Sequence, residues 1–213
     1  MTDTLQVLIA DDHPLFRNAL SEALSNTGTA VTIQQTDTLQ STLFHLENNT
    51  TDLLLLDLKM PGSEGLLGLI QIRTRFPEVA VAVITANEAS RTVAHVKAAG
   101  ALGYLPKSLS LEQLVDALRA LISGKGYFPA NHQADSHTID EDIDAITKLA
   151  SLTPKQQHVL ALIARGYLNK QIAYELSVKE TTIKTHVSEI FRKLNLYNRT
   201  QAAMYNQYLE VPE

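Results

Sequence analysis

The sequence predicts an α/β domain built on a parallel sheet, followed by a small all-α domain. In the first part, short apolar runs alternate with segments whose apolar residues recur at helical spacing, and several of these runs end on a polar side chain. Such alternation with short connections is typical of a parallel sheet covered by helices on both faces. In the last part the apolar residues recur only at helical spacing, which indicates a helical domain.

Five segments are predicted as strands. The central one, Leu53–Leu56, is four consecutive leucines without polar alternation, which indicates a strand buried on both faces of the sheet. It stops on Asp57 and is followed by Pro61-Gly62, a turn signal. The other predicted strands lie at residues 5–10, 31–33, 79–84 and 101–105.

Helices are predicted between and after these strands. Pro14 opens the first, since proline suits the first helical turn, and Ser110 caps the last. The second carries Leu39, Leu43 and Leu46, and the third and fourth cover about 64–76 and 88–99.

Polar side chains follow four of the predicted strands. Asp11 and Asp12 come after the first, and the later strands end on Asp57, Thr85 and Lys107. Because the carboxyl ends of parallel strands share one edge, where open α/β sheets bind ligands, we expect these groups to converge. Three carboxylates suit a hard divalent cation, Mg²⁺ above all, while a hydroxyl and a lysine suit a phosphoryl group. Singly each is better interpreted as a surface residue, and Asp11 and Asp12 as helix caps, but chance does not readily place all five at strand ends.

Composition narrows the class of protein. A hydrophobic content of 45% in 213 residues allows a core, and zero cysteines exclude disulfides, thiolate metal sites and cysteine nucleophiles. No apolar run is long enough to cross a bilayer, and Met1-Thr2-Asp3-Thr4 lacks an export signal, so we expect a cytoplasmic protein with no membrane partner. Residues 1–123 carry 8 Lys/Arg and 13 Asp/Glu, whereas residues 151–213 carry 8 and 5. A basic end of this size is weak evidence for nucleic-acid binding.

The stretch 124–150 differs from its surroundings. Residues 130–137 are almost without apolar side chains, which predicts a flexible linker, and we interpret His132 and His137 as solvated rather than as metal ligands. Apolar residues then recur at helical spacing, which predicts a short helix over about 140–149.

Residues 151–213 predict a helix-turn-helix. Thr153-Pro154-Lys155-Gln156 forms a capping box, and Asn169 is expected to cap the second helix. A longer helix over about 180–194 has an apolar stripe, and its opposite face presents Lys184, Thr185, Ser188 and Arg192. The second helix of such a pair lies in the major groove of DNA, although the pattern alone also allows a protein-interaction module.

Residues 5–123 resemble the receiver domain of bacterial two-component response regulators. The shared residues are Asp11-Asp12, Asp57-Leu58-Lys59-Met60-Pro61-Gly62, Thr85-Ala86 and Lys107. The resemblance implies a flavodoxin-like fold, a sensor histidine kinase as partner and Asp57 as the phosphoacceptor. It also implies Mg²⁺ held by Asp12, Asp57 and the Lys59 backbone carbonyl, with Asp11 acting through water.

The same resemblance implies a switch. Thr85 and Tyr104 match the pair in which a hydroxyl closes on the phosphoryl group while the ring turns inward, and Lys107 would pair with the phosphoryl oxygens. Many receivers have proline after this lysine, whereas here Pro106 precedes it, which leaves the isomer of the Lys107–Ser108 bond open.

An enzyme with an aspartate nucleophile is the alternative to this interpretation. Dehalogenase-type phosphatases also use a strand-end aspartate nucleophile, but they require a second carboxylate two residues later as general acid. That position is Lys59. We therefore expect no enzyme, beyond a receiver that catalyses its own phosphotransfer and dephosphorylation.

Residues 152–202 resemble the LuxR-type helix-turn-helix. The matching runs are Leu152-Thr153-Pro154, Asn169-Lys170-Gln171-Ile172-Ala173, Thr181-Thr182-Ile183-Lys184-Thr185-His186-Val187, Lys193-Leu194 and Asn198-Arg199-Thr200-Gln201-Ala202. This sequence differs from the family at four positions. The family often has acidic residues where Gln156, Gln157 and Gln171 stand, and a small polar residue where Leu168 stands.

The LuxR-type resemblance implies roles for particular residues. Base edges would be read by Lys184, Thr185 and Ser188, with Arg192 on the same DNA-binding face. Phosphates would lie near Lys170, Thr182 and Arg199, and His186 would have a packing or phosphate role. The final helix, about 199–208, would supply a dimer contact through Met204, Tyr205 and Tyr208.

Together the two resemblances follow the order of the NarL/FixJ class. We therefore predict a response regulator that binds promoter DNA as a homodimer, with a receiver at 1–123, a linker at 124–150 and a helix-turn-helix at 151–213. Two alternatives stay open: a receiver controlled by protein or ligand contacts without phosphorylation, and a helical domain that binds protein. From the opposite charges of the domains we expect weak docking that shields the Lys184 face or the final helix.

Overall fold

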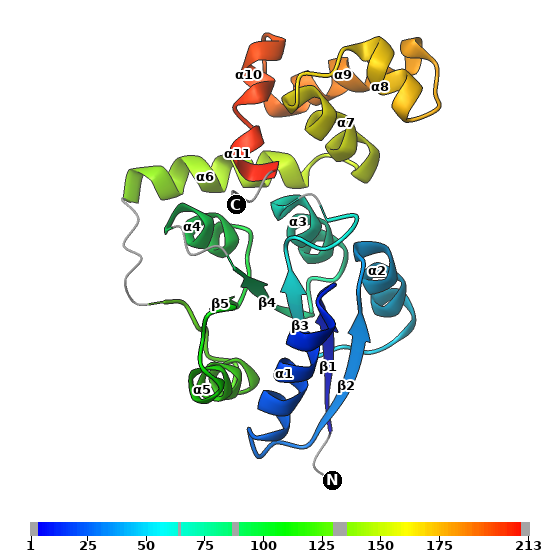
Figure 1. Ribbon diagram of the computed structural model, residues 1–213. Helices are drawn as coiled ribbons and strands as arrows, with labels where there is room; N and C mark the ends of the chain where they lie inside the picture. The colour runs from blue at the N-terminus through cyan, green and yellow to red at the C-terminus, as the bar shows by residue number, and fades with distance from the viewer. Residues whose placement is uncertain (1–3, 64, 87–89, 130–135, 210–213) are drawn as a thin grey trace.

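A five-stranded parallel sheet organises the first part of the chain (Figure 1). Its order is β2-β1-β3-β4-β5, which is the order of a flavodoxin-like fold and confirms the predicted fold class. The strands are β1 Leu5–Ala10, β2 Val31–Thr36, β3 Leu53–Asp57, β4 Ala80–Thr85 and β5 Gly103–Pro106. This computed structural model describes residues 4–63, 65–86, 90–129 and 136–209, so Met1–Asp3 and His132, which entered the sequence analysis, lie outside the described residues.

Helices cover both faces of the sheet. On one face lie α1 Pro14–Ser25 and α5 Leu111–Ile122, and on the other lie α2 Leu39–Asn48, α3 Leu66–Arg75 and α4 Ser90–Ala98 (Figure 1). Every residue of β3 is buried, which confirms the prediction of a central strand from its leucines. The segment from β1 to α5 is called the sheet domain below.

A tight turn follows β3 and fixes where this strand ends. Gly62 has a φ of 81°, a conformation that glycine adopts without strain, and the Ser63 N–H donates to the Met60 carbonyl (3.0 Å). Strand β3 therefore ends abruptly, with Asp57 at the tip of the strand and Lys59 in the turn that follows it.

The last part of the chain is helical. Its elements are α7 Pro154–Ala164, α8 Asn169–Glu175, α9 Glu180–Leu194, α10 Arg199–Ala203 and α11 Asn206–Leu209, together called the helical domain. The predicted capping box is present, since Gln156 N donates to Thr153 Oγ1 (3.3 Å) and Thr153 N donates to Gln156 Oε1 (3.1 Å). Buried Gln156 also accepts from Lys193 Nζ (3.0 Å) and donates to Glu189 Oε2 (2.6 Å), so its side chain ties α7 to α9.

Two predictions about these helices were wrong. Asn169 is the first residue of α8 rather than its cap; the cap position is Leu168, whose N–H donates to Gln171 Oε1 (2.7 Å). The predicted helix over 199–208 is broken into α10 and α11. Its break comes from N–H groups of Met204 and Tyr205 that donate three residues back, to Gln201 and Ala202, which tightens the chain.

The predicted linker has defined structure on both sides of residues 130–135, which lie outside the described residues. Helix α6 spans Ser136–Ala150 and so extends beyond the predicted 140–149 into the predicted linker. Near the start of that linker, the Tyr104 N–H donates to the Tyr127 carbonyl (2.7 Å), and Gly103 and Tyr127 form a bridge. The neighbouring rings of Tyr127 and Phe128 pack against the hydrophobic core, which explains why this segment follows β5.

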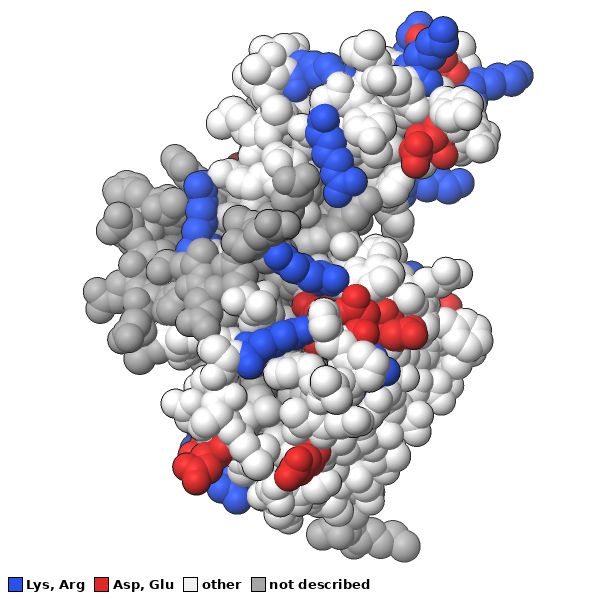
Figure 2. All heavy atoms as spheres, viewed as in Figure 1, with Lys and Arg blue, Asp and Glu red and all other residues white. Residues whose placement is uncertain are grey.

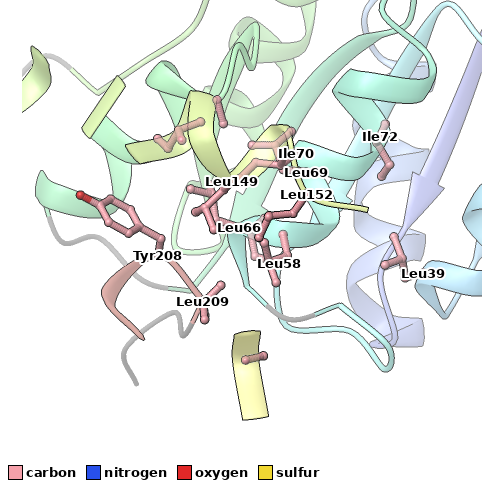
Figure 3. Close-up of a cluster of buried hydrophobic side chains, with 14 of the residues drawn as sticks. Leu39, Leu58, Leu66, Leu69, Ile70, Ile72, Leu149, Leu152, Tyr208 and Leu209 are labelled. Carbon is pink, nitrogen blue, oxygen red and sulfur yellow. The ribbon is translucent and has the colours of Figure 1, made fainter. Parts of the chain in front are cut away.

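One hydrophobic cluster joins the two domains (Figure 3). Leu149 and Leu152, at and after the end of α6, lie beside Leu66 at the start of α3, and α6 also contacts α4. Leu209 of α11 belongs to the same cluster. The domains therefore meet through apolar side chains and not through the opposite charges from which docking was predicted.

Candidate functional site

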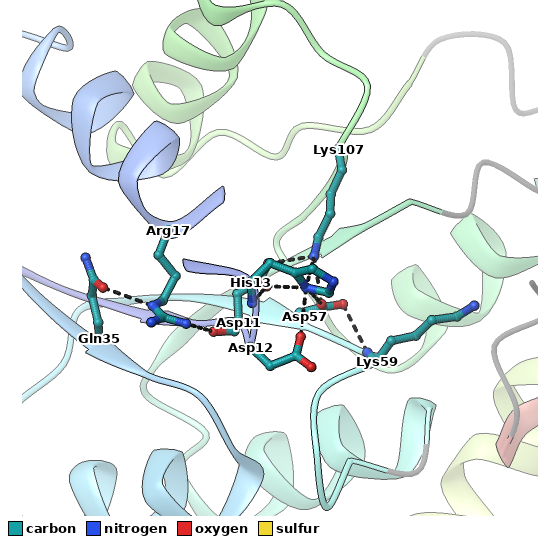
Figure 4. A network of polar contacts seen from close by, with 8 residues as sticks. All are labelled: Asp11, Asp12, His13, Arg17, Gln35, Asp57, Lys59 and Lys107. Carbon is teal, nitrogen blue, oxygen red and sulfur yellow. Dashed lines mark hydrogen bonds and ion pairs between the residues drawn. The ribbon is translucent and has the colours of Figure 1, made fainter. Parts of the chain in front are cut away.

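Two carboxylates are buried at the carboxyl edge of the sheet. Strands β1 and β3 are neighbours and pair Ala10 with Leu56, so the residues that follow, Asp11 and Asp57, lie side by side. Asp11 is 0% exposed and Asp57 is 2% exposed, while Asp12 keeps partial contact with solvent. The predicted convergence of the strand-end acids is thus observed (Figure 4).

Lys107 neutralises part of this charge. Its Nζ lies 2.7 Å from Asp11 Oδ2 and 2.8 Å from Asp57 Oδ2. Burial by itself would lower the pKa of Lys107, but hydrogen bonding and charge attraction from Asp11 and Asp57 together outweigh burial and raise that pKa above its ordinary value. Lys107 is therefore a stable cation at neutral pH. Its backbone N–H donates to the Thr85 carbonyl (2.8 Å), which fixes the end of β5 against β4.

The two predicted switch residues are both buried. Thr85 ends β4 and Tyr104 lies on β5, and each is 0% exposed. The Tyr104 ring belongs to the hydrophobic cluster that also contains residues of α6 and α11. The Lys107–Ser108 peptide bond, which the sequence left open, is trans.

The acids have the composition of a site for a hard cation. Oxygens of Asp11, Asp12 and Asp57, together with a nitrogen of His13, lie within 4.8 Å of one another. Three carboxylates face one ammonium group, so negative charge remains in excess, and oxygen donors of this kind are those that Mg²⁺ prefers. Lys59 N donates to Asp57 Oδ1 (3.0 Å), which keeps the Lys59 backbone beside the acids.

His13 is a site residue that the sequence analysis missed. Its Nδ1 lies 3.0 Å from Asp11 Oδ1 and 2.8 Å from Asp12 Oδ1 (Figure 4). The available signal was its position, since it is the third consecutive ionisable residue after the first strand.

Helix α9 presents the residues predicted to read DNA. Lys184, Thr185, Ser188 and Arg192 are all exposed. Lys184 Nζ pairs with Glu180 Oε1 (3.0 Å), while the hydroxyl of Ser188 donates to the Lys184 carbonyl (3.0 Å). Lys and Arg side chains are spread over the helical domain, as Figure 2 shows. This face is open to solvent in the structure.

The predicted phosphate contacts have different environments. Lys170 of α8 and Thr182 of α9 are exposed. Arg199, in contrast, donates to Asn169 Oδ1 (3.2 Å) and to the Tyr167 carbonyl, and partial burial lowers its pKa. These bonds tie α10 to the first residue of α8 and to the segment before it, which gives Arg199 a structural role.

His186 is half-buried. It lines a pocket of about 460 Å³ together with apolar residues that include Val159 and Ile183. Its Nδ1 is buried and has no hydrogen-bond partner among the described residues. This environment favours the packing role over the phosphate role that the sequence analysis also considered.

Of the three residues predicted to form a dimer contact, one is exposed to solvent and two are buried within this chain. Met204 is 69% exposed, whereas Tyr205 and Tyr208 are 8% and 6% exposed. The Tyr208 ring lies 4.8 Å from the His95 ring of α4 and 5.9 Å from the Tyr205 ring, measured between centroids. In this arrangement the sheet domain covers part of the final helix while the Lys184 face stays open.

The fold and this site define a receiver joined to a helix-turn-helix. Residues 7–119 match the response regulator receiver domain, and residues 150–206 match the luxR family of bacterial regulatory proteins. The chain belongs to the response regulators of the NarL/FixJ class, and it is a DNA-binding transcription regulator of two-component signalling.

Relatives of known function match nearly the whole chain. A glycerol metabolism activator from Pseudomonas putida is 36% identical and covers 93% of this chain and 93% of its own length. The nitrate/nitrite response regulator NarL from Escherichia coli is 30% identical, also with 93% of each chain covered. The response regulator RcsB of Salmonella enterica serovar Typhimurium, bound to a promoter with the phosphomimetic BeF₃⁻, gives a TM-score of 0.56 at 28% identity, covering 95% of this chain and 98% of that one.

The helices were compared with the length and hydropathy that a membrane-spanning helix needs. Among the described residues, each helix is too short or too polar to span a bilayer.

The ion pairs of Lys107 lead to a prediction about stability. In Lys107→Met, Asp11 and Asp57 stay buried without their cation, so we expect the free energy of unfolding without divalent cations to fall by roughly 3 kcal/mol. Urea denaturation measures this, and saturating Mg²⁺ should restore part of the loss. Lys125→Met, at an exposed lysine, is the control and should change stability by less than about 0.5 kcal/mol. Equal stability of Lys107→Met and the parent would contradict the importance of this ion pair.

Proposed function

We propose that this protein is a cytoplasmic transcription factor controlled by phosphorylation of Asp57. A sensor histidine kinase supplies the phosphoryl group, and the phosphorylated protein binds promoter DNA as a homodimer. The observation that carries the proposal is the ion pair of buried Asp57 with Lys107, beside Asp11 and Asp12.

The surroundings of Asp57 suit phosphoryl transfer. Asp57 is buried within the fold, yet it lines a hollow of about 500 Å³ with Lys59, Lys107 and His13, through which a phosphodonor can approach. Once Asp57 carries a phosphoryl group, Lys107 pairs with its oxygens and the Thr85 hydroxyl closes on it. Both interactions stabilise negative charge where transfer develops it.

The cation site lies beside the same carboxylate. Asp12, Asp57 and the Lys59 backbone carbonyl would hold Mg²⁺, with Asp11 acting through water. When bound, the ion would neutralise part of the negative charge on the transferred phosphoryl group. The excess negative charge of the three acids over Lys107 supports this assignment.

The helical domain is proposed to read DNA through α9. Lys184, Thr185 and Ser188 reach base edges, Arg192 lies on the same face, and Lys170 and Thr182 contact phosphates. The exposure of these residues and the matched luxR family support this role. RcsB, which is similar to this chain, has been solved as dimers bound to DNA.

The packing between the domains suggests how the two activities are coupled. Helix α11 contacts α3, and α6 contacts both α3 and α4. Tyr104 belongs to the same hydrophobic cluster as Tyr208 of α11. We propose that phosphorylation moves Thr85 and Tyr104, shifts α4 and loosens this packing, which frees the final helices to form a dimer.

Phosphorylation is tested by intact-mass measurement. With acetyl phosphate and Mg²⁺ we expect one added phosphoryl group, and none in Asp57→Asn, which keeps the shape of the side chain but lacks the nucleophile. Asp116→Asn, at an exposed carboxylate, is the matched control and should be modified like the parent. An added phosphoryl group in Asp57→Asn would refute the assignment, and no addition in the parent would favour a receiver that works without phosphorylation.

DNA reading is tested by fluorescence anisotropy over a range of salt concentrations. Lys184→Ala should cost about 1–3 kcal/mol on the preferred sequence, because it removes a contact with a base edge. Lys170→Ala should weaken binding to every sequence and lower the salt slope by about one. Lys125→Ala, at an exposed lysine outside the helical domain, is the control. If both helical-domain variants bind like the parent, the helical domain is a protein-interaction module.

Coupling is tested from the receiver side of the contact. His95→Ala removes the ring against Tyr208 and leaves the helical domain intact. Since such aromatic pairs contribute about 0.5–1.5 kcal/mol, the unphosphorylated variant should bind DNA roughly two- to tenfold more tightly than the parent. Arg91→Ala, an exposed position on the same helix, should bind like the parent. Unchanged or weaker DNA binding by His95→Ala would count against shielding of the final helix.

A further inference from the structure

The backbone holds His13 over the acidic cluster. His13 is the cap residue of α1 and is extended (φ −95°, ψ 104°), the region to which the following Pro14 restricts it. Its N–H donates to Asp11 Oδ1 (2.8 Å), which closes the turn between β1 and α1. The ring is therefore presented to the carboxylates by the local chain, although most of the side chain is exposed.

We propose that His13 Nδ1 is a ligand of the cation bound at Asp12 and Asp57, so that the site has a nitrogen donor beside its oxygens. This inference rests on the proposed cation site and extends it by one residue. Neighbouring ligands of an octahedral ion with bonds of about 2.1 Å lie roughly 3 Å apart. Nδ1 lies 2.8 Å from Asp12 Oδ1, which is close to that spacing, and 3.9 Å from Asp57 Oδ2. Its 3.0 Å contact with Asp11 Oδ1 is a hydrogen bond to an acid that is not a direct ligand.

Lys107 and the imidazole approach different oxygens of Asp11. Lys107 Nζ pairs with Oδ2, whereas His13 faces Oδ1. A cation beside His13 therefore leaves the Lys107 ion pair with Asp11 in place. Asp57 Oδ2 is 2.8 Å from Lys107 Nζ and 3.9 Å from His13 Nδ1, and Lys107 Nζ itself lies 3.5 Å from His13 Nδ1. The cation must therefore bind the imidazole on the side of Asp12, away from the ammonium group.

A nitrogen donor changes which ions the site selects. Mg²⁺ prefers oxygen ligands, whereas imidazole suits later first-row metals, whose affinities increase from Mn²⁺ to Co²⁺ and Ni²⁺. The site should therefore bind Co²⁺ more tightly than oxygen ligands alone would, and His13 should be the residue that determines this preference.

The test compares ion selectivity in full-length, tag-free protein. Isothermal titration calorimetry gives dissociation constants for Mg²⁺ and Co²⁺ in the parent, in His13→Ala and in His45→Ala, a histidine on α2 that serves as the control. We expect His13→Ala to weaken Co²⁺ binding about tenfold or more and Mg²⁺ binding less than about twofold. Pulsed electron paramagnetic resonance of bound Mn²⁺ should show coupling to a nitrogen that His13→Ala removes.

The possible results separate this inference from the proposed function. If the parent binds Mg²⁺ but His13→Ala binds Co²⁺ as tightly as the parent does, the nitrogen ligand is refuted and the cation site stands. Tighter binding of both ions by His13→Ala would show that the imidazole competes with the cation, which also overturns the inference. A parent that binds neither ion would refute the cation site itself.

Discussion

The ion pairs of Lys107 with Asp11 and Asp57 are the interaction on which the functional edge of the sheet depends. Burying one carboxylate is costly, and burying two side by side is more so, unless a cation lies between them. Parallel strands make this possible, because β1, β3 and β5 all end at the same edge. The main chain of Lys107, from which this ammonium group extends, is held by the bond from its N–H to the Thr85 carbonyl. Lys107 thus connects the buried acids, through its side chain, with the predicted switch residue Thr85, through its backbone.

A second dependence runs from this edge to the helical domain through apolar packing. Tyr104 shares one hydrophobic cluster with residues of α3, α4, α6 and α11. Protein interiors are densely packed, so a change in the position of a buried ring is felt by its neighbours. This gives a physical route between the two ends of the molecule that needs no rigid linker. It also explains why the covered surface is the final helix, which carries Tyr208, rather than the polar face of α9.

Much of this could be predicted from the sequence, because the signals were local. Four leucines identified the central strand, the capping box at Thr153 identified α7, and the position of acids at strand ends identified the cluster. The interface between the domains was missed because it depends on contacts between distant segments. Its residues, such as Leu149 and Leu209, look in sequence like the ordinary apolar stripe of a helix.

Other misses have equally specific causes. The packing of Tyr127 and Phe128 was missed because both lie in the segment 124–150, which was predicted as a linker from its polar residues. Their two aromatic rings pack against the hydrophobic core beside β5. His13 was overlooked because the pair of acids before it already accounted for a cation site. The break between α10 and α11 depends on hydrogen bonds three residues apart, which periodicity over ten residues does not distinguish from a continuous helix.

The shared core also bears on how such proteins diverge and how they can be engineered. Two domains joined only by a linker could be exchanged as modules, but here the apolar residues on α6 and α11 match a particular surface of α3 and α4. A chimera that joins this receiver to the helical domain of a relative would place unmatched apolar side chains against each other or in water. Successful exchange would therefore require that α6 be transferred with the helical domain and that the facing residues of α3 and α4 be changed with it.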